Sequence, residues 1–370
     1  MSQPRQPLTP LVSVEQLQRP VPGGTGTYVL GLLRGFEDLA TTVDAYKASG
    51  FIAALGSRSQ RLHGGGEVFS SHLPVRLLTT LWSRGGRLNI AGKHSLFHAT
   101  SPAFPVVEGA PLTVTIHDTA WRDVPAAFSP KARKWHERRV RQALQSAQVI
   151  FTPAQSVKKS LVDDGADASQ VRVFREGVDH LEAPDIDEVG PFLKAFGVTG
   201  EFILTAGTLE PRKNLATLLR AYRKAKETSA LPPLVIVGPA GWGDAGLGSG
   251  EKDVHLVGRV TPALLSALYK SCTLFVAVPL AEGYGLPQVE AMSMGAPVVS
   301  SPVPSIEDAQ APAMVVEPTD VDSVASALTQ VTSSAELRAE LVDKGLRHTR
   351  NLKWRDAAQS HLDAWEQFSR

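Results

Sequence analysis

Short apolar runs alternate along this chain with segments of helical periodicity, and this alternation restricts the folds open to it. Eight runs of four or five residues, each bounded by turn signals, are typical of buried parallel strands: 112–116, 148–151, 171–174, 202–205, 234–237, 254–257, 274–277 and 297–300. Helical patterns lie among them at 28–36, 132–147, 214–226, 261–270 and 323–331. The alternation predicts α/β architecture with doubly wound parallel sheets.

The length of 370 residues is too great for one ordinary domain and suits two. The segment 181–190 is rich in proline and acidic residues, which indicates an interdomain linker. We therefore expect domains at 1–183 and 190–351 that face a ligand-binding cleft. Residues 352–370 follow as an amphipathic helix, with Trp354, Ala358, Leu362, Trp365 and Phe368 at helical spacing. Loops are expected over 51–100.

Composition excludes several classes of protein. The chain is 43% hydrophobic and 20% charged, as in an ordinary globular enzyme. A single cysteine, Cys272, excludes a disulfide framework and a multi-cysteine zinc site. No apolar run reaches 18 residues and Met1–Pro10 lacks an apolar core, so we expect neither a membrane span nor a secretory signal. A cytoplasmic protein is the expectation.

Charge is distributed unevenly along the chain. Residues 1–180 carry 21 basic against 14 acidic residues, a balance of +7, and residues 181–370 carry 17 against 23, a balance of −6. Either the N-terminal half meets an anionic partner or the asymmetry is chance surface charge. The basic segment Lys131–Arg141, which contains Trp135, repeats the choice: it is a solvated helix face or a contact with an anionic membrane or lipid pyrophosphate.

The segment 205–215 joins a strand end to a helix through a glycine-containing turn. Arg212 and Lys213 fall at this carboxyl edge of the sheet, just before Asn214, which we expect to cap the helix. Two cations beside helix N–H groups suit a pyrophosphate, although a solvated basic loop would also fit.

The segment 279–295 follows the predicted strand 274–277. Pro287 suits the start of a short helix that Gly295 and Pro297 end, while Gly283 and Gly285 permit close approach to a ligand. Glu282 and Glu290 would face one cleft from different elements and bind hydroxyl groups. Alternatively, they complement the helix dipole.

Two further segments lie in the N-terminal half. His117 and Asp118 directly follow the predicted strand 112–116, at the ligand edge of a sheet, although a lone histidine is often structural. Gly23 and Gly24 begin a run that fails the dinucleotide fingerprint, because Val29 stands where glycine is required. They form either a ligand-binding loop or an ordinary tight turn.

The spacing from Glu282 to Glu290 and the upstream segment Gly207–Asn214 resemble glycosyltransferase family 4, the retaining transferases with two Rossmann-like domains known as the GT-B type. Matching pieces include Gly258-Arg259-Val260, 295–299 and the tail 354–368, so the resemblance covers nearly the whole chain. It implies an N-terminal acceptor-binding domain, a C-terminal donor-binding domain and a last helix that packs back on the first domain.

The resemblance also implies a role for each matching residue. Arg212 and Lys213 would hold the donor pyrophosphate, Glu282 the transferred sugar and Glu290 the ribose. The remaining donor contacts would come from Gly207, from Gly283, Tyr284, Gly285 and Leu286, and from the base pocket at Gly258, Arg259 and Val260. His117 would face the donor sugar, and Gly23, Gly24 and Asp118 would lie near the donor phosphate and acceptor.

The predicted function is transfer of a hexose, mannose among the candidates, from a nucleoside-diphosphate sugar to a hydroxyl acceptor with retention of configuration, in the synthesis of a cell-envelope glycan, glycolipid or polysaccharide. The acceptor would be a glycan or a lipid-linked sugar, with peripheral membrane contact as an option. No metal, other cofactor or nucleic acid is expected. The alternatives are a non-catalytic nucleotide-sugar-binding protein and an epimerase or phosphorylase on the same two-domain plan.

Overall fold

The computed structural model describes residues 8–49, 66–242 and 253–368. The chain falls into two compact units. The first comprises Met1–Trp121, Phe128–His180 and Lys353–Arg370, and the second comprises Arg122–Ala127 and Leu181–Leu352. Each unit is built around its own parallel sheet.

The first unit contains a seven-stranded sheet with the order β3-β2-β1-β5-β7-β8-β9, and all neighbouring strands are parallel. The strands are β1 (Pro10–Ser13), β2 (Asp44–Ser49), β3 (Val68–Pro74), β5 (Leu96–Ala99), β7 (Leu112–Thr115), β8 (Val149–Thr152) and β9 (Val171–Val173). A small sheet pairs β4 (Arg87–Asn89) with β6 (Val106–Glu108).

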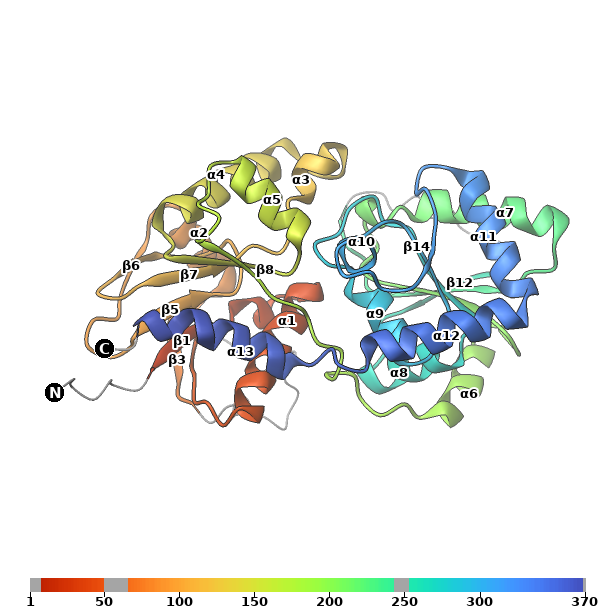
Figure 1. Cartoon of the computed structure of the whole chain (residues 1–370), viewed down its shortest axis with the longest axis horizontal. Helices are drawn as coiled ribbons and strands as arrows, with labels where there is room; N and C mark the ends of the chain where they lie inside the picture. The colour runs from red at the N-terminus through yellow and green to blue at the C-terminus, as the bar shows by residue number, and fades with distance from the viewer. Residues whose placement is uncertain (1–7, 50–65, 243–252, 369–370) are drawn as a thin grey trace. The chain divides into compact units, whose positions relative to one another are not determined.

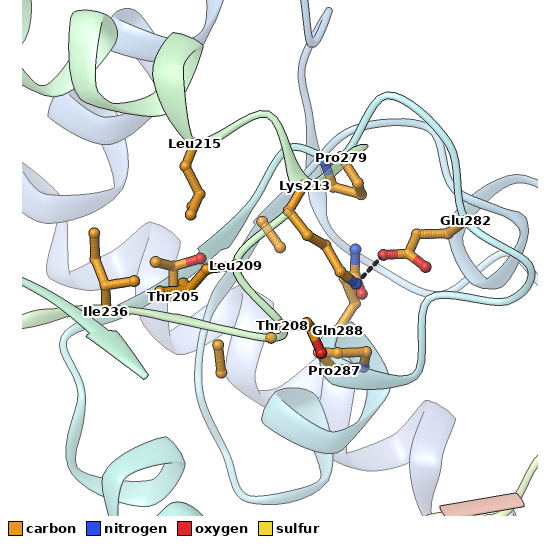
Figure 2. Close-up of a pocket in the computed structure, with 13 residues that line it drawn as sticks. Thr205, Thr208, Leu209, Lys213, Leu215, Ile236, Pro279, Glu282, Pro287 and Gln288 are labelled. Atoms are coloured by element: carbon orange, nitrogen blue, oxygen red, sulfur yellow. Dashed lines mark hydrogen bonds and ion pairs between the residues drawn. The ribbon is translucent and has the colours of Figure 1, made fainter. Parts of the chain in front are cut away.

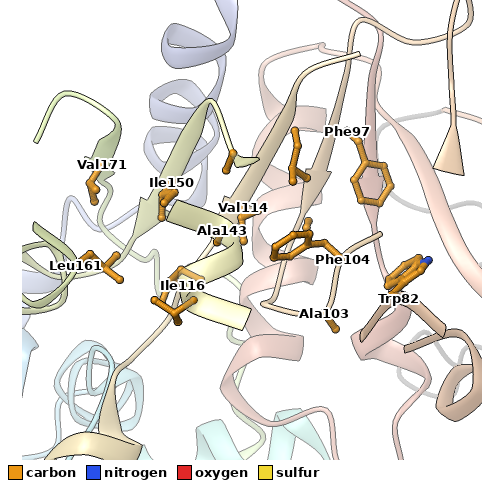
Figure 3. Close-up of a cluster of buried hydrophobic side chains, with 14 of the residues drawn as sticks. Trp82, Phe97, Ala103, Phe104, Val114, Ile116, Ala143, Ile150, Leu161 and Val171 are labelled. Carbon is orange, nitrogen blue, oxygen red and sulfur yellow. The ribbon is translucent and has the colours of Figure 1, made fainter. Parts of the chain in front are cut away.

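Helices cover both faces of this sheet, as a doubly wound fold requires (Figure 1). On one face α2 (Val75–Ser83), α4 (Pro130–Ser146) and α5 (Gln155–Asp163) bury a core that includes Trp82, Phe97 and Phe104 (Figure 3). On the other face α1 (Gly23–Asp38) and α13 (Trp354–Trp365) bury Tyr28, Phe36, Trp354 and Trp365. The short α3 (Ala120–Asp123) follows β7.

A polar network lies inside this second core. The Tyr28 hydroxyl lies 2.7 Å from Thr115 Oγ1, 3.1 Å from His98 Nε2 and 3.0 Å from His361 Nε2. His361 belongs to α13, and its Nδ1 lies 2.7 Å from the Ala357 carbonyl. All four side chains of the network are buried, so these bonds replace water for groups that would otherwise be desolvated without partners.

The second unit contains a six-stranded parallel sheet with the order β12-β11-β10-β13-β14-β15. Its strands are β10 (Ile203–Ala206), β11 (Leu234–Val237), β12 (Val254–Gly258), β13 (Leu274–Ala277), β14 (Val298–Ser300) and β15 (Met314–Val315). Its helices are α6 (Val189–Lys194), α7 (Leu215–Thr228), α8 (Pro262–Ser271), α9 (Leu286–Ser293), α10 (Pro304–Glu307), α11 (Val321–Ser333) and α12 (Ala335–Thr349). The predicted fold class, two doubly wound α/β units, is confirmed.

The prediction of loops over 51–100 is wrong for the part of that segment that the structure describes. Residues 66–100 contain β3, α2, β4 and β5, while 51–65 lie outside the described residues. β5 (LFHA) is buried along its whole length, but a histidine interrupts its short apolar run. β3 escaped prediction because it is only half-buried and carries the polar residues Ser70, Ser71 and His72. An apolar run is therefore absent although the strand pairs with β2.

The basic helix α4 is not uniformly solvated. Arg139 is buried: its Nε donates to the Pro102 carbonyl at 2.8 Å, its Nη2 donates to the Phe104 carbonyl at 2.6 Å, and its guanidinium lies 3.9 Å from the Phe104 ring centroid. Trp135 is half-buried and donates to Ser83 Oγ at 3.0 Å. Neither side chain belongs to the exposed basic surface of this helix.

Within the described ranges, no helix combines the length and apolar character needed to cross a bilayer.

Candidate functional site

The candidate site lies at the carboxyl end of β10, where the chain turns toward α7. Gly207 follows the strand with φ of 151°, and its N–H donates to the Val237 carbonyl. A Cβ on Gly238 would lie 1.8 Å from the Gly207 carbonyl oxygen, so glycine is required there for the two loops to run this close. The loop is thus held against β11 before the chain reaches Arg212.

Asn214 joins two loops rather than capping α7. It precedes the helix, but its backbone is left-handed with φ of 57° and its side chain makes no capping bond. Instead the amide donates to the carbonyls of Val278, at 3.0 Å, and Pro318, at 2.7 Å. The predicted cap is therefore wrong, because the side chain ties the β10–α7 loop to the loop that follows β13.

Arg212 and Lys213 converge on Glu282, about seventy residues later in the chain. They lie in a single 3-10 turn, Pro211–Lys213, and Glu282 lies in the loop after β13. Arg212 Nη1 donates to Glu282 Oε2 at 2.7 Å and to the Ala281 carbonyl at 2.9 Å. Lys213 Nζ is paired with Glu282 Oε1, as Figure 2 shows. The structure therefore brings three predicted catalytic residues together.

A fourth charged residue, Glu210, completes this cluster. Its Oε1 accepts from Arg212 Nε at 3.0 Å and from Nη2 at 2.7 Å, and the residue is only 2% exposed. Sequence reasoning assigned Glu210 no role. The available signal was its position two residues before an arginine in a loop at a ligand edge, since buried charges are usually paired.

Electrostatics within the cluster separate the two carboxylates. Burial alone would raise the pKa of Glu282, but the charges of Arg212 and Lys213 outweigh it and lower this pKa to about 2. At Glu210 burial prevails over the same two cations and raises the pKa. Glu282 is consequently a permanent anion at neutral pH, held by two cations.

A pocket opens beside this cluster, between the ends of β10 and β13 (Figure 2). Its polar wall includes Thr208, Lys213, Glu282 and Gln288. Its apolar side includes Leu209, Leu215, Ile236, Pro279 and Pro287. The remaining lining comes from Thr205, Ala206, Gly207 and Ala277. A pocket with a small number of convergent polar groups at this edge of a parallel sheet is typical of a ligand site.

Glu290 lies on α9 and does not line this pocket. It is 7% exposed and accepts a hydrogen bond from the Tyr269 hydroxyl at 3.0 Å. Burial, followed by the nearby Glu290 charge, raises the pKa of Tyr269 well above its usual value. Gly295, with φ of 84°, directly follows the helix end at Met294, as predicted.

Ser305 holds the loop before α9 in place through two hydrogen bonds. Its backbone N–H donates to the Tyr284 carbonyl at 2.7 Å, and its hydroxyl donates to the Gly285 carbonyl at 3.2 Å. Gly285 has φ of 98°, and a Cβ there would lie 2.6 Å from Val303 Cγ2. Gly283, Tyr284 and Leu286 are buried around it, so this segment can present backbone groups only in a fixed geometry.

Gly258, Arg259 and Val260 form the turn from β12 to α8. Gly258 has φ of 73°, and its carbonyl accepts from the Gly238 N–H at 2.9 Å. Gly258 and Arg259 are exposed, and the three residues are not part of the pocket lining. They border the β11 loop that carries Gly238.

In the first unit, His117 and Asp118 follow β7 as predicted. His117 Nε2 lies 2.9 Å from the Thr100 carbonyl, and the ring packs edge-to-face on Tyr28 at 4.7 Å. Burial lowers the pKa of His117, so a neutral ring is favoured. Asp118 Oδ1 accepts from the Ala120 N–H at 3.1 Å.

Gly23 and Gly24 lie in the first turn of α1 and not in a loop, which corrects their predicted local structure. A Cβ on either residue would have no heavy atom within 4 Å. Packing therefore does not explain glycine there.

Throughout the described residues, no group of three or more His, Cys, Asp or Glu side chains is placed to hold a metal ion. What the second unit offers is a pair of cations and a glycine-containing turn at the carboxyl edge of a parallel sheet. This is the arrangement of a site for a phosphorylated nucleotide.

Family models identify both halves of the chain. Residues 22–181 match the model "Glycosyltransferase Family 4", and residues 200–334 match "Glycosyl transferases group 1". The chain belongs to glycosyltransferase family 4 and is a glycosyltransferase.

Curated relatives agree with this assignment. The chain is 29% identical over 273 residues to O-antigen chain mannosyltransferase B of Escherichia coli, and the aligned region covers 68% of this chain and 69% of that protein. It is 28% identical over 279 residues to MMP alpha-(1->4)-mannosyltransferase of Mycolicibacterium hassiacum, covering 70% and 66% respectively. It also matches the E. coli serotype-specific mannosyltransferase WbdA at 30% identity over 180 residues, 45% of the chain but only 22% of WbdA.

Solved structures agree on the fold. The structure of Anabaena HepE in complex with UDP and glucose aligns with a TM-score of 0.72 at 16% identity, over 97% of this chain and 100% of that one. Sucrose-phosphate synthase from Thermosynechococcus elongatus aligns with a TM-score of 0.72 at 17% identity, over 97% and 98%. At these identities the likeness establishes the two-sheet GT-B fold.

Proposed function

We propose that this protein transfers a hexose, with mannose as the favoured sugar, from a nucleoside-diphosphate donor to a hydroxyl group of a cell-envelope glycan, with retention at the anomeric carbon. The observation that carries the proposal is the convergence of Arg212 and Lys213 on Glu282, beside a pocket at the end of β10 that Lys213 and Glu282 line. The sugar is suggested by the mannosyltransferases among the curated relatives.

The two cations would serve the leaving group. When the bond between the anomeric carbon and the donor phosphate breaks, negative charge develops on the departing nucleoside diphosphate. Arg212 and Lys213 would stabilise that charge from a fixed, partly desolvated position. Because Glu282 is their present counter-ion, donor phosphate oxygens would replace it, and the freed carboxylate would accept hydrogen bonds from hydroxyls of the transferred sugar.

Other residues of the second unit would bind the rest of the donor. Glu290 would accept hydrogen bonds from the ribose hydroxyls, and Gly207 together with Gly283, Tyr284, Gly285 and Leu286 would approach phosphate and sugar. Gly258, Arg259 and Val260 would border the base. The glycines with positive φ support these roles because they let a ligand approach the backbone closely, and the buried Glu290 supports them because it places a carboxylate at the same edge of the sheet.

The first unit would bind the acceptor side. His117 would contact sugar through its imidazole, while Gly23, Gly24 and Asp118 would lie near phosphate and acceptor. The N-terminal glycines support this role because the first turn of α1 presents backbone N–H groups without side chains over them. His117 is held in one orientation by Thr100 and Tyr28, as a binding residue would require.

Retention would not require a protein nucleophile. The acceptor hydroxyl would attack the anomeric carbon on the face from which the phosphate departs, and its proton would pass to a departing phosphate oxygen. One carbon–oxygen bond breaks and one forms, so the step balances without a carboxylate in the position used by retaining glycosidases. Proton NMR of the product tests retention: a product with inverted anomeric configuration would refute it.

We also propose that the reaction needs neither a metal nor another cofactor, because Arg212 and Lys213 would supply the positive charge that a divalent ion otherwise supplies. Turnover should be unchanged by an excess of EDTA. A loss of turnover that Mg²⁺ or Mn²⁺ restores would contradict this.

The donor can be identified directly. GDP-, UDP-, ADP- and dTDP-sugars should be screened for thermal stabilisation, because a ligand at 100 times its dissociation constant adds about 2.7 kcal/mol to stability. GDP-mannose is the expected hit, and release of GDP should then depend on an added acceptor. If no sugar nucleotide stabilises the protein, the donor assignment fails.

The acceptor would be a glycan or a lipid-linked sugar, and the protein would act in the cytoplasm at the inner face of the membrane. The positive balance of the N-terminal half supports attraction to an anionic surface. No role with nucleic acid is proposed.

A further inference from the structure

The exposed large apolar side chains in the described part of the first unit gather at one place. They are Leu77, Leu81 and Val106, with 59%, 48% and 40% of their surface exposed. Leu77 and Leu81 are one turn apart on α2, and the Val106 N–H donates to the carbonyl of Gly86, just beyond the end of that helix. Apolar side chains that cluster on a surface usually mark a contact with a partner.

Basic side chains surround these leucines. Arg76 lies on α2 and Arg84 directly follows its end; both are exposed and bracket the leucines in sequence. The neighbouring α4 is joined to α2 by the bond between Trp135 and Ser83, and both helices cover the same face of the sheet (Figure 1). The exposed side of α4 carries Lys131, Lys134, Arg138 and Arg141, whose spacing of three, four and three residues places them on one stripe.

This face carries a surplus of positive charge, with six basic side chains. In the regions that the structure describes, none of the six basic side chains forms an ion pair. α2 contains no acidic residue. The one acid of α4, Glu137, accepts a hydrogen bond from the Trp121 indole at 2.7 Å. We call these six basic residues with Leu77 and Leu81 the α2–α4 face.

We propose that the α2–α4 face docks on an anionic lipid bilayer, with Leu77 and Leu81 entering the interface between headgroups and acyl chains. Basic residues alone would suit any polyanion, and leucines alone would suit a protein. Their combination on adjacent helices is the pattern of an interfacial membrane contact. This proposal rests on the proposed function only where it assumes that a lipid-linked acceptor is presented at the membrane. Binding to vesicles can be tested without any donor.

The size of the effect sets the design of the test. Each basic residue near an anionic surface contributes about 1 kcal/mol, or about fivefold in partition coefficient. Screening over about 8–10 Å at physiological salt reduces this contribution. Neutralising four lysines and arginines should thus weaken binding by two orders of magnitude or more at low salt.

Insertion of the leucines can be read with an environment-sensitive dye. Cys272 is the single cysteine, is buried, and has a pKa raised to about 12 by burial, so it should not compete for a thiol label. The full chain carrying Leu81→Cys should show a blue shift on vesicles of phosphatidylglycerol and phosphatidylcholine, and none on pure phosphatidylcholine. Leu346→Cys, an exposed leucine of α12 in the second unit, is the matched control and should show no shift.

Co-sedimentation with the same vesicles tests the charges. Serine at Lys131, Lys134, Arg138 and Arg141 should abolish binding at low salt, and serine at both leucines should reduce it at least tenfold. Serine at four exposed basic residues of the second unit, Lys194, Arg220, Arg223 and Lys270, should leave it unchanged. Donor binding should survive in every variant, which separates this surface from the donor site.

Three results would overturn the proposal. The first is that the unmodified protein does not bind anionic vesicles at low salt. The second is that replacing the control charges weakens binding as much as replacing those of α4. The third is that binding requires the charges while the label at position 81 stays in water, which would indicate a soluble polyanion as the partner.

Discussion

The indole of Trp354 occupies the space that a side chain on Gly31 would need. A Cβ on Gly31 would lie 2.1 Å from indole Cε2, and one on Gly35 would lie 2.3 Å from the Trp354 carbonyl oxygen. The indole N–H donates to His180 Nδ1 at 3.0 Å and the backbone N–H to Asp179 Oδ1 at 2.9 Å. α13 therefore packs on α1 through glycines that admit a fully buried tryptophan.

Gly31→Ala should destabilise the first unit by about 1–3 kcal/mol, because the added methyl group forces α1 and α13 apart. In a unit of this size the melting temperature should fall by about 2–4 °C per kcal/mol. Gly190→Ala in α6 is the control, since a Cβ there meets nothing within 4 Å and alanine favours helix. Equal melting temperatures for the Gly31 variant and the unmodified protein would contradict the packing argument.

The apolar runs predict five of the six strands in the sheet of the second unit, but only β7, β8 and β9 in the seven-stranded sheet of the first. Each of the eight apolar runs corresponds to a strand, with bounds within one residue, and strands such as β8 and β11 are apolar throughout because both of their faces are buried. β2, with the sequence DAYKAS, carries polar residues, so no run marks it. The need for glycine at positions 31 and 35 of α1 could not be predicted either, because the group packed against them is a tryptophan more than 300 residues away.

Part of the site follows from topology. β10 and β13 are adjacent parallel strands, so the loops that follow them must meet, and this brings Arg212 and Lys213 to Glu282. The hydrogen-bond partners of the individual side chains cannot be predicted from this topology. The left-handed backbone of Asn214 and the burial of Glu210 depend on the packing of loops that lie far apart in sequence.

Protonation of buried histidines should weaken the first unit in acid. Burial lowers the pKa of His98 well below its usual value and that of His361 from about 6.5 to about 3. As the pH falls below about 6.5, these histidines take up protons in the unfolded chain but not yet in the folded one. The free energy of unfolding therefore decreases as the pH falls, and for His361 it does so until the pH reaches about 3. Each such histidine should cost about 1.4 kcal/mol per pH unit.

Urea unfolding between pH 7 and pH 5 measures this slope. His361→Gln removes one titrating group while keeping an acceptor for the Tyr28 hydroxyl, so its slope should be smaller by about one proton. An identical slope in that variant would show that His361 is not the neutral buried group described.

Arg212→Ala and Lys213→Ala should each lower turnover by a factor on the order of 10² or more, because each removes charge that stabilises the leaving group. Steady-state kinetics with a saturating donor measure this. Near-normal turnover in both variants would remove these residues from the mechanism.

Glu210 should act through Arg212 as a positioning residue. Glu210→Gln keeps the shape but weakens the two bonds to the guanidinium, so the turnover number should fall about 10- to 100-fold, as for a misplaced catalytic group. Asp253→Asn is the matched control: it removes a carboxylate paired with Lys226 in the same unit. If the role of Glu210 is purely structural, both variants should have the same turnover number and should differ only in melting temperature.

The two carboxylates of the donor site should separate when the bare nucleoside diphosphate is titrated by calorimetry. Glu290→Gln should weaken binding about 10- to 100-fold, since a hydrogen bond to a charged group contributes about 1.5–3 kcal/mol. Tyr269→Phe, which removes only the hydroxyl that donates to Glu290, should have a smaller effect.

Glu282→Gln should bind the diphosphate as well as or better than the unmodified protein, because the anion that is paired with Arg212 and Lys213 is gone. Sugar transfer by that variant should nevertheless fall, since the carboxylate that accepts from the sugar hydroxyls is lost. Equal losses of diphosphate affinity in the Glu282 and Glu290 variants would show that the assignment of one to sugar and the other to ribose is wrong.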